Sequence, residues 1–111
     1  MEAKSQEHLP LTESVFYILL ALQKPRHGYG IMQFVEKMSN KRVHLGPGTL
    51  YGALKTLQEK NWIELISTDN QTRKKEYIIT EIGKVVIQLE LERLEELLAN
   101  GKKVLKGEFE E

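Results

Sequence analysis

Hydrophobic and polar positions along the chain predict three helices, a β-hairpin and a final long helix, in that order. Residues 13–23 and 29–38 carry apolar side chains at helical spacing. Thr12 is a good N-cap for the first of these helices, and Pro25 stops it. Residues 43–45 are expected to form a short extended piece before the third helix.

The third helix begins within the stretch GPGTLYGALKTLQEKNW. Gly46 takes the N-cap position and Pro47 the first helical position, where its missing N–H costs nothing. The apolar residues that follow recur at i, i+3, i+4 and i+7, which predicts one core-facing stripe of Leu50, Ala53, Leu54 and Leu57. Asn61 is expected to adopt the left-handed conformation just past the end of this helix.

Two strands and a long helix complete the pattern. Residues 62–67 and 75–79 are rich in Ile, Leu, Trp and Tyr, and the polar loop TDNQTRK between them predicts a hairpin with a flexible basic tip. Thr80 caps the last helix. The order is typical of a winged helix-turn-helix, so the expected fold class is α+β, mainly helical with a small hairpin. We expect a flexible N-terminal arm at 1–11, a winged helix-turn-helix domain at 12–80, and a C-terminal dimerisation helix and tail at 81–111.

The distribution of charged residues along the chain adds to this prediction. The formal net charge of the 111 residues is zero. Residues 24–75, however, contain ten Lys or Arg against four Asp or Glu, a local balance of +6. A basic middle between acidic ends is what a local phosphate-facing surface requires, and whole-chain charge is the weaker statistic.

The sequence lacks the residues that several classes of function require. The chain has no cysteine, and its histidines, His8, His27 and His44, have no metal-ligand spacing. We therefore expect no enzyme and no metal or other cofactor. The longest apolar run, residues 15–22, is far shorter than the ~20 residues that span a bilayer. The first ten residues lack the basic start of a signal peptide, so a cytoplasmic, nucleoid-associated protein without a membrane partner is expected.

Three groups of residues form a candidate surface for double-stranded DNA. The second helix of a helix-turn-helix presents its first turns to base edges, and the outward residues there are Gly48, Thr49, Tyr51, Gly52 and Lys55. The hairpin tip adds Asn70, Gln71, Arg73, Lys74 and Lys75, whose cations can displace counterions from phosphates. His27 and Tyr29 flank a helix start whose free N–H groups can hold a phosphate. Each residue alone also fits packing or a solvated surface, and the combination favours DNA.

The last helix carries more apolar residues than one small domain can cover. Ile82, Val85 and Leu89 are expected to pack on the domain. A second stripe, with the 3.5-residue repeat of a helix–helix seam, contains Ile87, Leu91, Leu94 and Leu98. The apolar first helix is expected to add Phe16, Leu19 and Leu20. These residues predict a two-fold homodimer that binds an inverted-repeat operator, with its recognition helices about 34 Å apart.

Three motifs in this order resemble those of PadR-type transcriptional regulators, in the short form with a single C-terminal dimerisation helix. They are HGYGI at 27–31, PGTLYGAL at 47–54 and RKKEYIITEIG at 73–83. The resemblance covers about residues 12–98. It implies a bacterial dimeric repressor whose third helix and wing bind operator DNA. It further implies that Tyr51 is the family's helix tyrosine and that the basic contacts are Lys55, Arg73 and Lys74.

Some positions depart from the family pattern. Gly46 stands where a serine cap is usual, Asn61 replaces a glycine, and Glu76 stands where a paired tyrosine is common. Some relatives bind flat aromatic drugs between tryptophans of their C-terminal helices, but the last helix here has no aromatic residue before Phe109. A small-molecule effector is left open, with its identity unknown. The alternative function is a winged-helix protein-interaction module that does not bind DNA.

Overall fold

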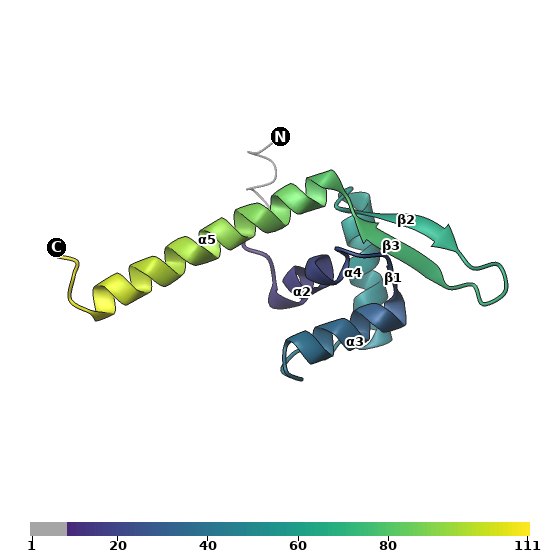
Figure 1. Cartoon of the computed structure of the whole chain (residues 1–111), viewed down its shortest axis with the longest axis horizontal. Coiled ribbons are helices and arrows are strands. Elements are labelled where there is room, and N and C mark those ends of the chain that lie inside the picture. Colours follow the sequence, from purple (N-terminus) through teal and green to yellow (C-terminus); the bar gives the residue numbers. More distant parts are fainter. Residues whose placement is uncertain (1–8) are drawn as a thin grey trace.

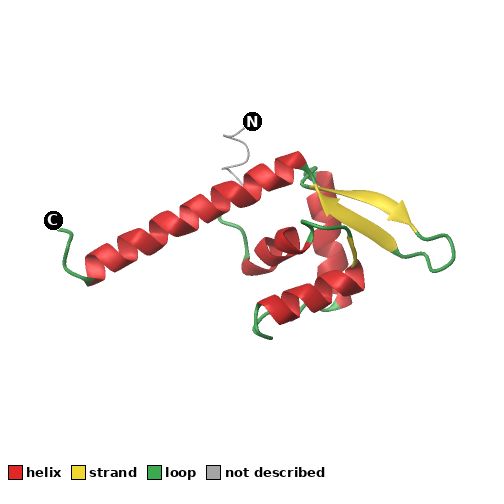
Figure 2. Cartoon of the chain, in the orientation of Figure 1, coloured by secondary structure: helices red, strands yellow, loops and turns green. Residues whose placement is uncertain are grey.

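Residues 9–111, which the computed structural model describes, form helices and antiparallel strands close to the expected order (Figure 1). Most of the expected N-terminal arm, residues 1–8, lies outside this described part. The elements are α2 (Glu13–Ala21), β1 (Arg26–His27), α3 (Gly28–Met38), α4 (Pro47–Glu59), β2 (Ile63–Thr68), β3 (Lys75–Ile79) and α5 (Glu81–Leu105). Figure 2 shows that helices dominate and that the strands form a small sheet, which confirms the predicted α+β fold.

Local capping signals set the helix ends as the sequence predicts. The Thr12 side chain accepts a hydrogen bond from the Val15 N–H at 3.2 Å, and the Thr80 side chain accepts one from the Gly83 N–H at 3.0 Å. Asn61 has a φ of 63°, the left-handed conformation expected past the end of α4. α2 ends at Ala21 and therefore stops before the predicted residue 23.

The sheet has the strand order β1-β3-β2, with both pairs antiparallel. β2 and β3 form the predicted hairpin, which projects from the helical body as a wing (Figure 1). The third strand, β1, was not predicted: Arg26 pairs with Tyr77, and His27 pairs with Glu76. This pairing places the start of α3 beside the base of the wing.

Residues 43–45 were predicted to form a short strand before the third helix, and this prediction is wrong. They belong to the turn between α3 and α4 and pair with no strand of the described chain. The buried Ser39 hydroxyl accepts a hydrogen bond from the Val43 N–H at 3.0 Å. Asn40 and Lys41 reverse the chain with positive φ angles of 58° and 66°. A side chain therefore satisfies the backbone where a neighbouring strand would have done so.

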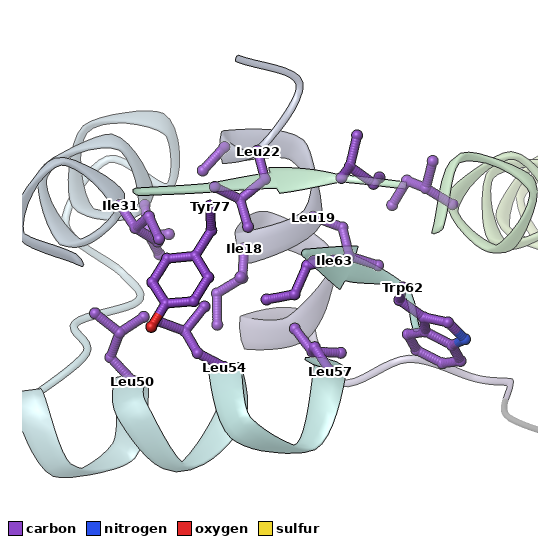
Figure 3. Close-up of a cluster of buried hydrophobic side chains, with 14 of the residues drawn as sticks. Ile18, Leu19, Leu22, Ile31, Leu50, Leu54, Leu57, Trp62, Ile63 and Tyr77 are labelled. Atoms are coloured by element: carbon purple, nitrogen blue, oxygen red, sulfur yellow. The ribbon is translucent and has the colours of Figure 1, made fainter. Parts of the chain in front are cut away.

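The core forms around α2, against which α3, α4 and the sheet pack (Figure 3). The largest fully buried side chains include Ile18, Leu19, Leu22, Ile31, Leu50, Leu54 and Leu57. Leu19 is fully enclosed and Ile87 is only 7% exposed, so both belong to the protomer's own core. This corrects the expected interface, because neither side chain is free to meet a second copy. Phe16 and Leu20 are partly buried against the same core.

Both predicted apolar stripes are present on α5. Ile82 and Leu89 of the first stripe are partly buried, and Leu91 of the second stripe is 42% exposed. Gly83, Val86, Ile87 and Glu90 of the first half are buried against the domain, whereas Val85 is exposed. At the same spacing of three and four residues the buried face continues as exposed leucines: Leu94, Leu97, Leu98 and Leu105. Figure 1 shows this second half of α5 extending beyond the helical body. The unbroken helix also passes through Asn100 and Gly101.

A buried carboxylate joins α5 to the segment before α2. Glu90 is 2% exposed and accepts a hydrogen bond from the Leu11 N–H at 3.0 Å. Arg93 donates to the same carboxylate through Nε at 2.6 Å and Nη2 at 2.9 Å. The hydrogen bonds from Arg93 lower the pKa of Glu90, and the Leu11 N–H adds to this, although burial acts in the opposite direction.

Candidate nucleic-acid interface

The start of α3, the first turns of α4 and the wing meet around one hollow of about 640 Å³. Among its lining residues are His27, Tyr29, Tyr51, Arg73, Lys74 and Lys75, which the sequence predicted as site residues. The pairing of β1 with β3 brings them together, because it ties the residues before α3 to the strand that follows the wing tip. Residues from all three predicted groups therefore share one concave surface, and Tyr51 is the α4 residue among them.

The remaining helix residues of the predicted site lie on the outer face of α4. Gly48, Thr49, Gly52 and Lys55 are exposed there, while Leu50, Leu54 and Leu57 are buried. A Cβ at Gly48 or Gly52 would meet no atom within 4 Å, so packing inside the protomer does not require glycine at either position. Glycine inside a helix costs about 1 kcal/mol relative to alanine. A flat surface for an approaching molecule is a physical reason for Gly52.

Tyr51 lies across the start of α3. Gly28 is buried at this start, and a Cβ there would collide with the Tyr51 hydroxyl. The Tyr51 ring is nevertheless 50% exposed. Glycine at position 28 thus lets the phenol rest against the N-terminal backbone of α3, where helix N–H groups lack intrahelical acceptors. Gly30 plays no such part, since its nearest neighbour would be 3.9 Å away.

His27 and Arg26 of β1 have different roles. His27 Nδ1 lies 3.2 Å from the Lys75 carbonyl oxygen. A carbonyl can only accept, so Nδ1 carries the proton and Nε2 remains for an outside partner. The Arg26 side chain donates through Nε to the Ala21 carbonyl at 2.7 Å, and its guanidinium lies 4.8 Å from the Phe34 ring centroid. Arg26 therefore stabilises the fold, because these contacts hold its guanidinium against the Ala21 carbonyl and the Phe34 ring.

The wing tip is an ordered turn organised by Asp69. The Asp69 carboxylate accepts hydrogen bonds from the Gln71 N–H at 2.9 Å and the Thr72 N–H at 3.3 Å. These bonds lower the pKa of Asp69. Arg73 closes the turn with a φ of 60° and donates its N–H to the Asp69 carbonyl at 2.7 Å. The one acidic residue of the tip thus shapes the loop that presents Asn70 and Gln71, which are both exposed.

Four cations of this surface are uncommitted. Within residues 9–111, no ion pair engages Lys55, Arg73, Lys74 or Lys75, and all four are exposed. Arg42, by contrast, pairs with Glu13 away from the hollow. Unpaired cations beside an exposed helix face give the surface a positive potential that is available to an external anion.

Tyr77 is one of the residues of the hollow that were not predicted as site residues, as are Gln33 and Thr72. Tyr77 of β3 is 4% exposed and also lines the hollow. Figure 3 shows its ring reaching from β3 toward Leu50 and Leu54 of α4. The alternation of the strand predicts that Tyr77 points inward, but a sequence pattern does not reveal whether its hydroxyl finds a partner.

Neither a metal nor a membrane site emerges from the described residues. Over 9–111, the His, Asp and Glu side chains do not gather into a group of three or more that could hold a metal ion. In the same part of the chain, every helix is too short or too polar to cross a membrane.

A helix-turn-helix pair followed by a two-stranded wing defines the winged helix-turn-helix class of proteins. Residues 17–89 match the family model described as "Transcriptional regulator PadR-like family". This match spans more than half of the 111 residues, and the chain belongs to the PadR-like family. Members of this family are transcriptional regulators and not enzymes.

Curated relatives carry no assigned activity. A 37.1 kDa protein in transposon TN4556 of Streptomyces fradiae is 35% identical over 66 residues, which are 60% of this chain and 18% of that protein. "Uncharacterized protein X" of Lysinibacillus sphaericus is 33% identical over 70 residues, 61% of this chain and 64% of that protein. The matched region thus spans less than two thirds of either relative.

Solved structures share the fold over most of the chain. RosR of H. salinarum is 26% identical, with a TM-score of 0.61, over 87% of this chain and 98% of that one. A PadR family transcription regulator from Clostridium difficile R20291 has a TM-score of 0.67 at 23% identity, over 84% and 97% of the two chains. A third, titled "The complex structure of hsRosR-S4", has a TM-score of 0.66 at 23% identity, over 91% and 97%.

Proposed function

We propose that this protein is a DNA-binding transcriptional repressor that acts as a homodimer on an inverted-repeat operator. In this proposal residues 12–80 form the DNA-binding domain, and α5 supplies the dimer contact. The exposed first turns of α4 enter the major groove, and the wing contacts the adjacent backbone.

The observation that carries DNA binding is the convergence of uncommitted cations around the hollow and the outer face of α4. Lys55, Arg73, Lys74 and Lys75 face solvent without ion-pair partners among the described residues. Neutralising DNA phosphates with such cations releases counterions and drives association. The face of α4 between these cations carries Gly48 and Gly52, so base edges can approach the helix backbone there.

Support for a dimer comes from the second half of α5. Leu94, Leu97 and Leu98 are 39%, 53% and 58% exposed on one continuous stripe. Within the described chain nothing covers them, and such a contiguous apolar patch marks a site of association. A second copy related by a two-fold axis would bury the same stripe on both chains. Phe16 and Leu20, which are partly exposed, are the α2 residues retained in this proposed interface.

The test is DNA binding as a function of salt. Wild-type protein would select its best duplex from a random-sequence pool, and its affinity for that duplex would be measured from 50 to 300 mM salt. Four free cations per protomer give eight per dimer, so the slope of log affinity against log salt can reach about −7. Binding that is absent, or that does not weaken with salt, contradicts the proposal.

The alternative is a winged-helix module that uses this surface to bind a protein. Such a complex would bury charge pairs of limited number and would not show the large counterion release of a DNA duplex. The same salt titration therefore separates the two functions.

A further inference from the structure

The Tyr77 hydroxyl belongs to a buried residue but makes no hydrogen bond within the described part of the chain. The residue is 96% enclosed. In this part of the chain every fully enclosed side-chain nitrogen or oxygen has a partner. The Tyr77 oxygen is therefore not fully enclosed, and it reaches open space through the hollow that Tyr77 lines. A polar group kept at such a place without a protein partner is prepared for an external one.

The surroundings of this hydroxyl favour an anion. Tyr51 lies close enough to raise the pKa of Tyr77, after the larger effect of burial, so Tyr77 stays protonated and able to donate. The Tyr51 hydroxyl rests on Gly28, at the positive end of α3. Lys75 and His27, whose Nε2 is uncommitted, complete the rim. Donors thus surround the hollow on several sides.

We propose that this hollow seats one sugar–phosphate unit of the DNA backbone, with the Tyr77 and Tyr51 hydroxyls donating to the phosphate oxygens. The proposal rests on the proposed DNA-binding function and names the backbone contact of this site. DNA is the favoured source of the phosphate because the hollow lies between the start of α3, Tyr51 of α4 and the wing, and α4 and the wing would contact the same duplex. Its volume of about 640 Å³ also accommodates the adjoining sugars.

This assignment changes the role expected for Tyr51. The sequence favours Tyr51 as a reader of base edges, since it stands in the first turns of α4. Its hydroxyl, however, is directed to the start of α3, where a backbone phosphate would lie. Loss of this hydroxyl should therefore weaken binding to all sequences alike.

The decisive variant is Tyr77→Phe, which removes only the hydroxyl. Because that hydroxyl has no protein hydrogen bond, the melting temperature should stay the same or rise. Affinity for the duplex selected by the wild-type protein should fall about 10-fold per half-site, as for a hydrogen bond to a charged group. Tyr17→Phe is the control for loss of a tyrosine hydroxyl outside the hollow, because Tyr17 lies on α2 and interacts with Arg42 instead. Tyr51→Phe tests the same site at a half-exposed position, where folding is not at risk.

The phosphate itself is located with duplexes that carry a single neutral methylphosphonate at successive positions. We expect one position per half-site at which the methylphosphonate lowers the affinity of the wild-type protein but does not lower the affinity of Tyr77→Phe any further. The variant already lacks the hydrogen bond to that phosphate. Equal additional losses for both proteins at every position overturn the assignment. The assignment is also overturned in favour of a free anion by a second pattern of results. In that pattern inorganic phosphate alone raises the melting temperature of the wild type but not of Tyr77→Phe, and no methylphosphonate position affects the two proteins differently. Absence of salt-sensitive binding by the wild type would remove the proposed function as well.

Discussion

Replacement of Glu90 by glutamine tests the buried link between α5 and the DNA-binding domain. The substitution keeps the size of the side chain and one oxygen for the Leu11 N–H, but it removes the charge that Arg93 faces through two hydrogen bonds. Arg93 is about one-third exposed and can turn to water, so its own loss is modest. The Leu11 bond weakens from a charge-assisted to a neutral one. Together these changes should cost about 2 kcal/mol of unfolding free energy.

The effect of Glu90→Gln should depend on pH in a defined direction. The pKa of Glu90 is lowered in the folded protein, so its contribution is complete above the pKa of the unfolded chain, about 4.3, and is lost as pH falls through the folded value. Wild type and variant should therefore differ at pH 7, and the difference should begin to shrink only as the pH falls below about 4.3.

Thermal unfolding at a fixed protein concentration measures this difference. A loss of about 2 kcal/mol corresponds to a melting temperature roughly 8 °C lower at pH 7. Glu95→Gln, an exposed carboxylate on the same helix, is the control and should change little. Equal stability of Glu90→Gln and wild type at pH 7, or a difference that persists unchanged into acid, would refute the role given to this carboxylate.

Further substitutions test the other surfaces. Leu94→Asp places a charge on the exposed stripe of α5 and should give folded monomers by light scattering; an unchanged dimer would exclude that stripe as the interface. Gly83→Ala should lower stability by about 1–3 kcal/mol in urea unfolding, because its Cβ would collide with the Trp62 carbonyl oxygen, a backbone atom that cannot turn aside. Lys74→Ala should weaken binding to all duplexes and reduce the salt slope by about one per half-site. A slope equal to that of wild type would mean that Lys74 meets no phosphate.

Features set by neighbouring residues could be predicted from the sequence. The caps at Thr12 and Thr80, the left-handed Asn61 and the Pro47 start of α4 each depend on a few adjacent residues. Outward positions on α4 follow directly from the leucine spacing of that helix. Because the winged helix-turn-helix order combines such local signals, the fold was predictable as well.

Features that depend on distant residues could not be predicted in the same way. β1 consists of Arg26 and His27 alone, and only its pairing with Tyr77 and Glu76 makes it a strand. Glu90 could not be predicted as a core residue, because a carboxylate interrupts the apolar pattern of the helix. Its burial depends on the hydrogen bonds from Arg93 and from the Leu11 N–H. For that reason Ile87 was assigned to the dimer seam, although it packs in the protomer's own core.

The hollow illustrates the same limit for the site. Its basic residues were predictable because charge can be read from composition. The unsatisfied hydroxyl of Tyr77 and the close approach of Tyr51 to Gly28 depend on packing between β3, α4 and α3. These contacts decide which groups face a ligand, and no spacing rule in the sequence reports them.

The most direct test of the account is the dependence of binding on half-site spacing. The selected inverted-repeat duplex would be compared with one in which about five base pairs are inserted at its centre, which turns one half-site to the opposite face of the helix. A dimer with two linked recognition helices should lose most of its affinity for the altered duplex and keep the steep salt dependence for the original. Equal affinity for both duplexes would show that the two helices do not act together and would contradict the account.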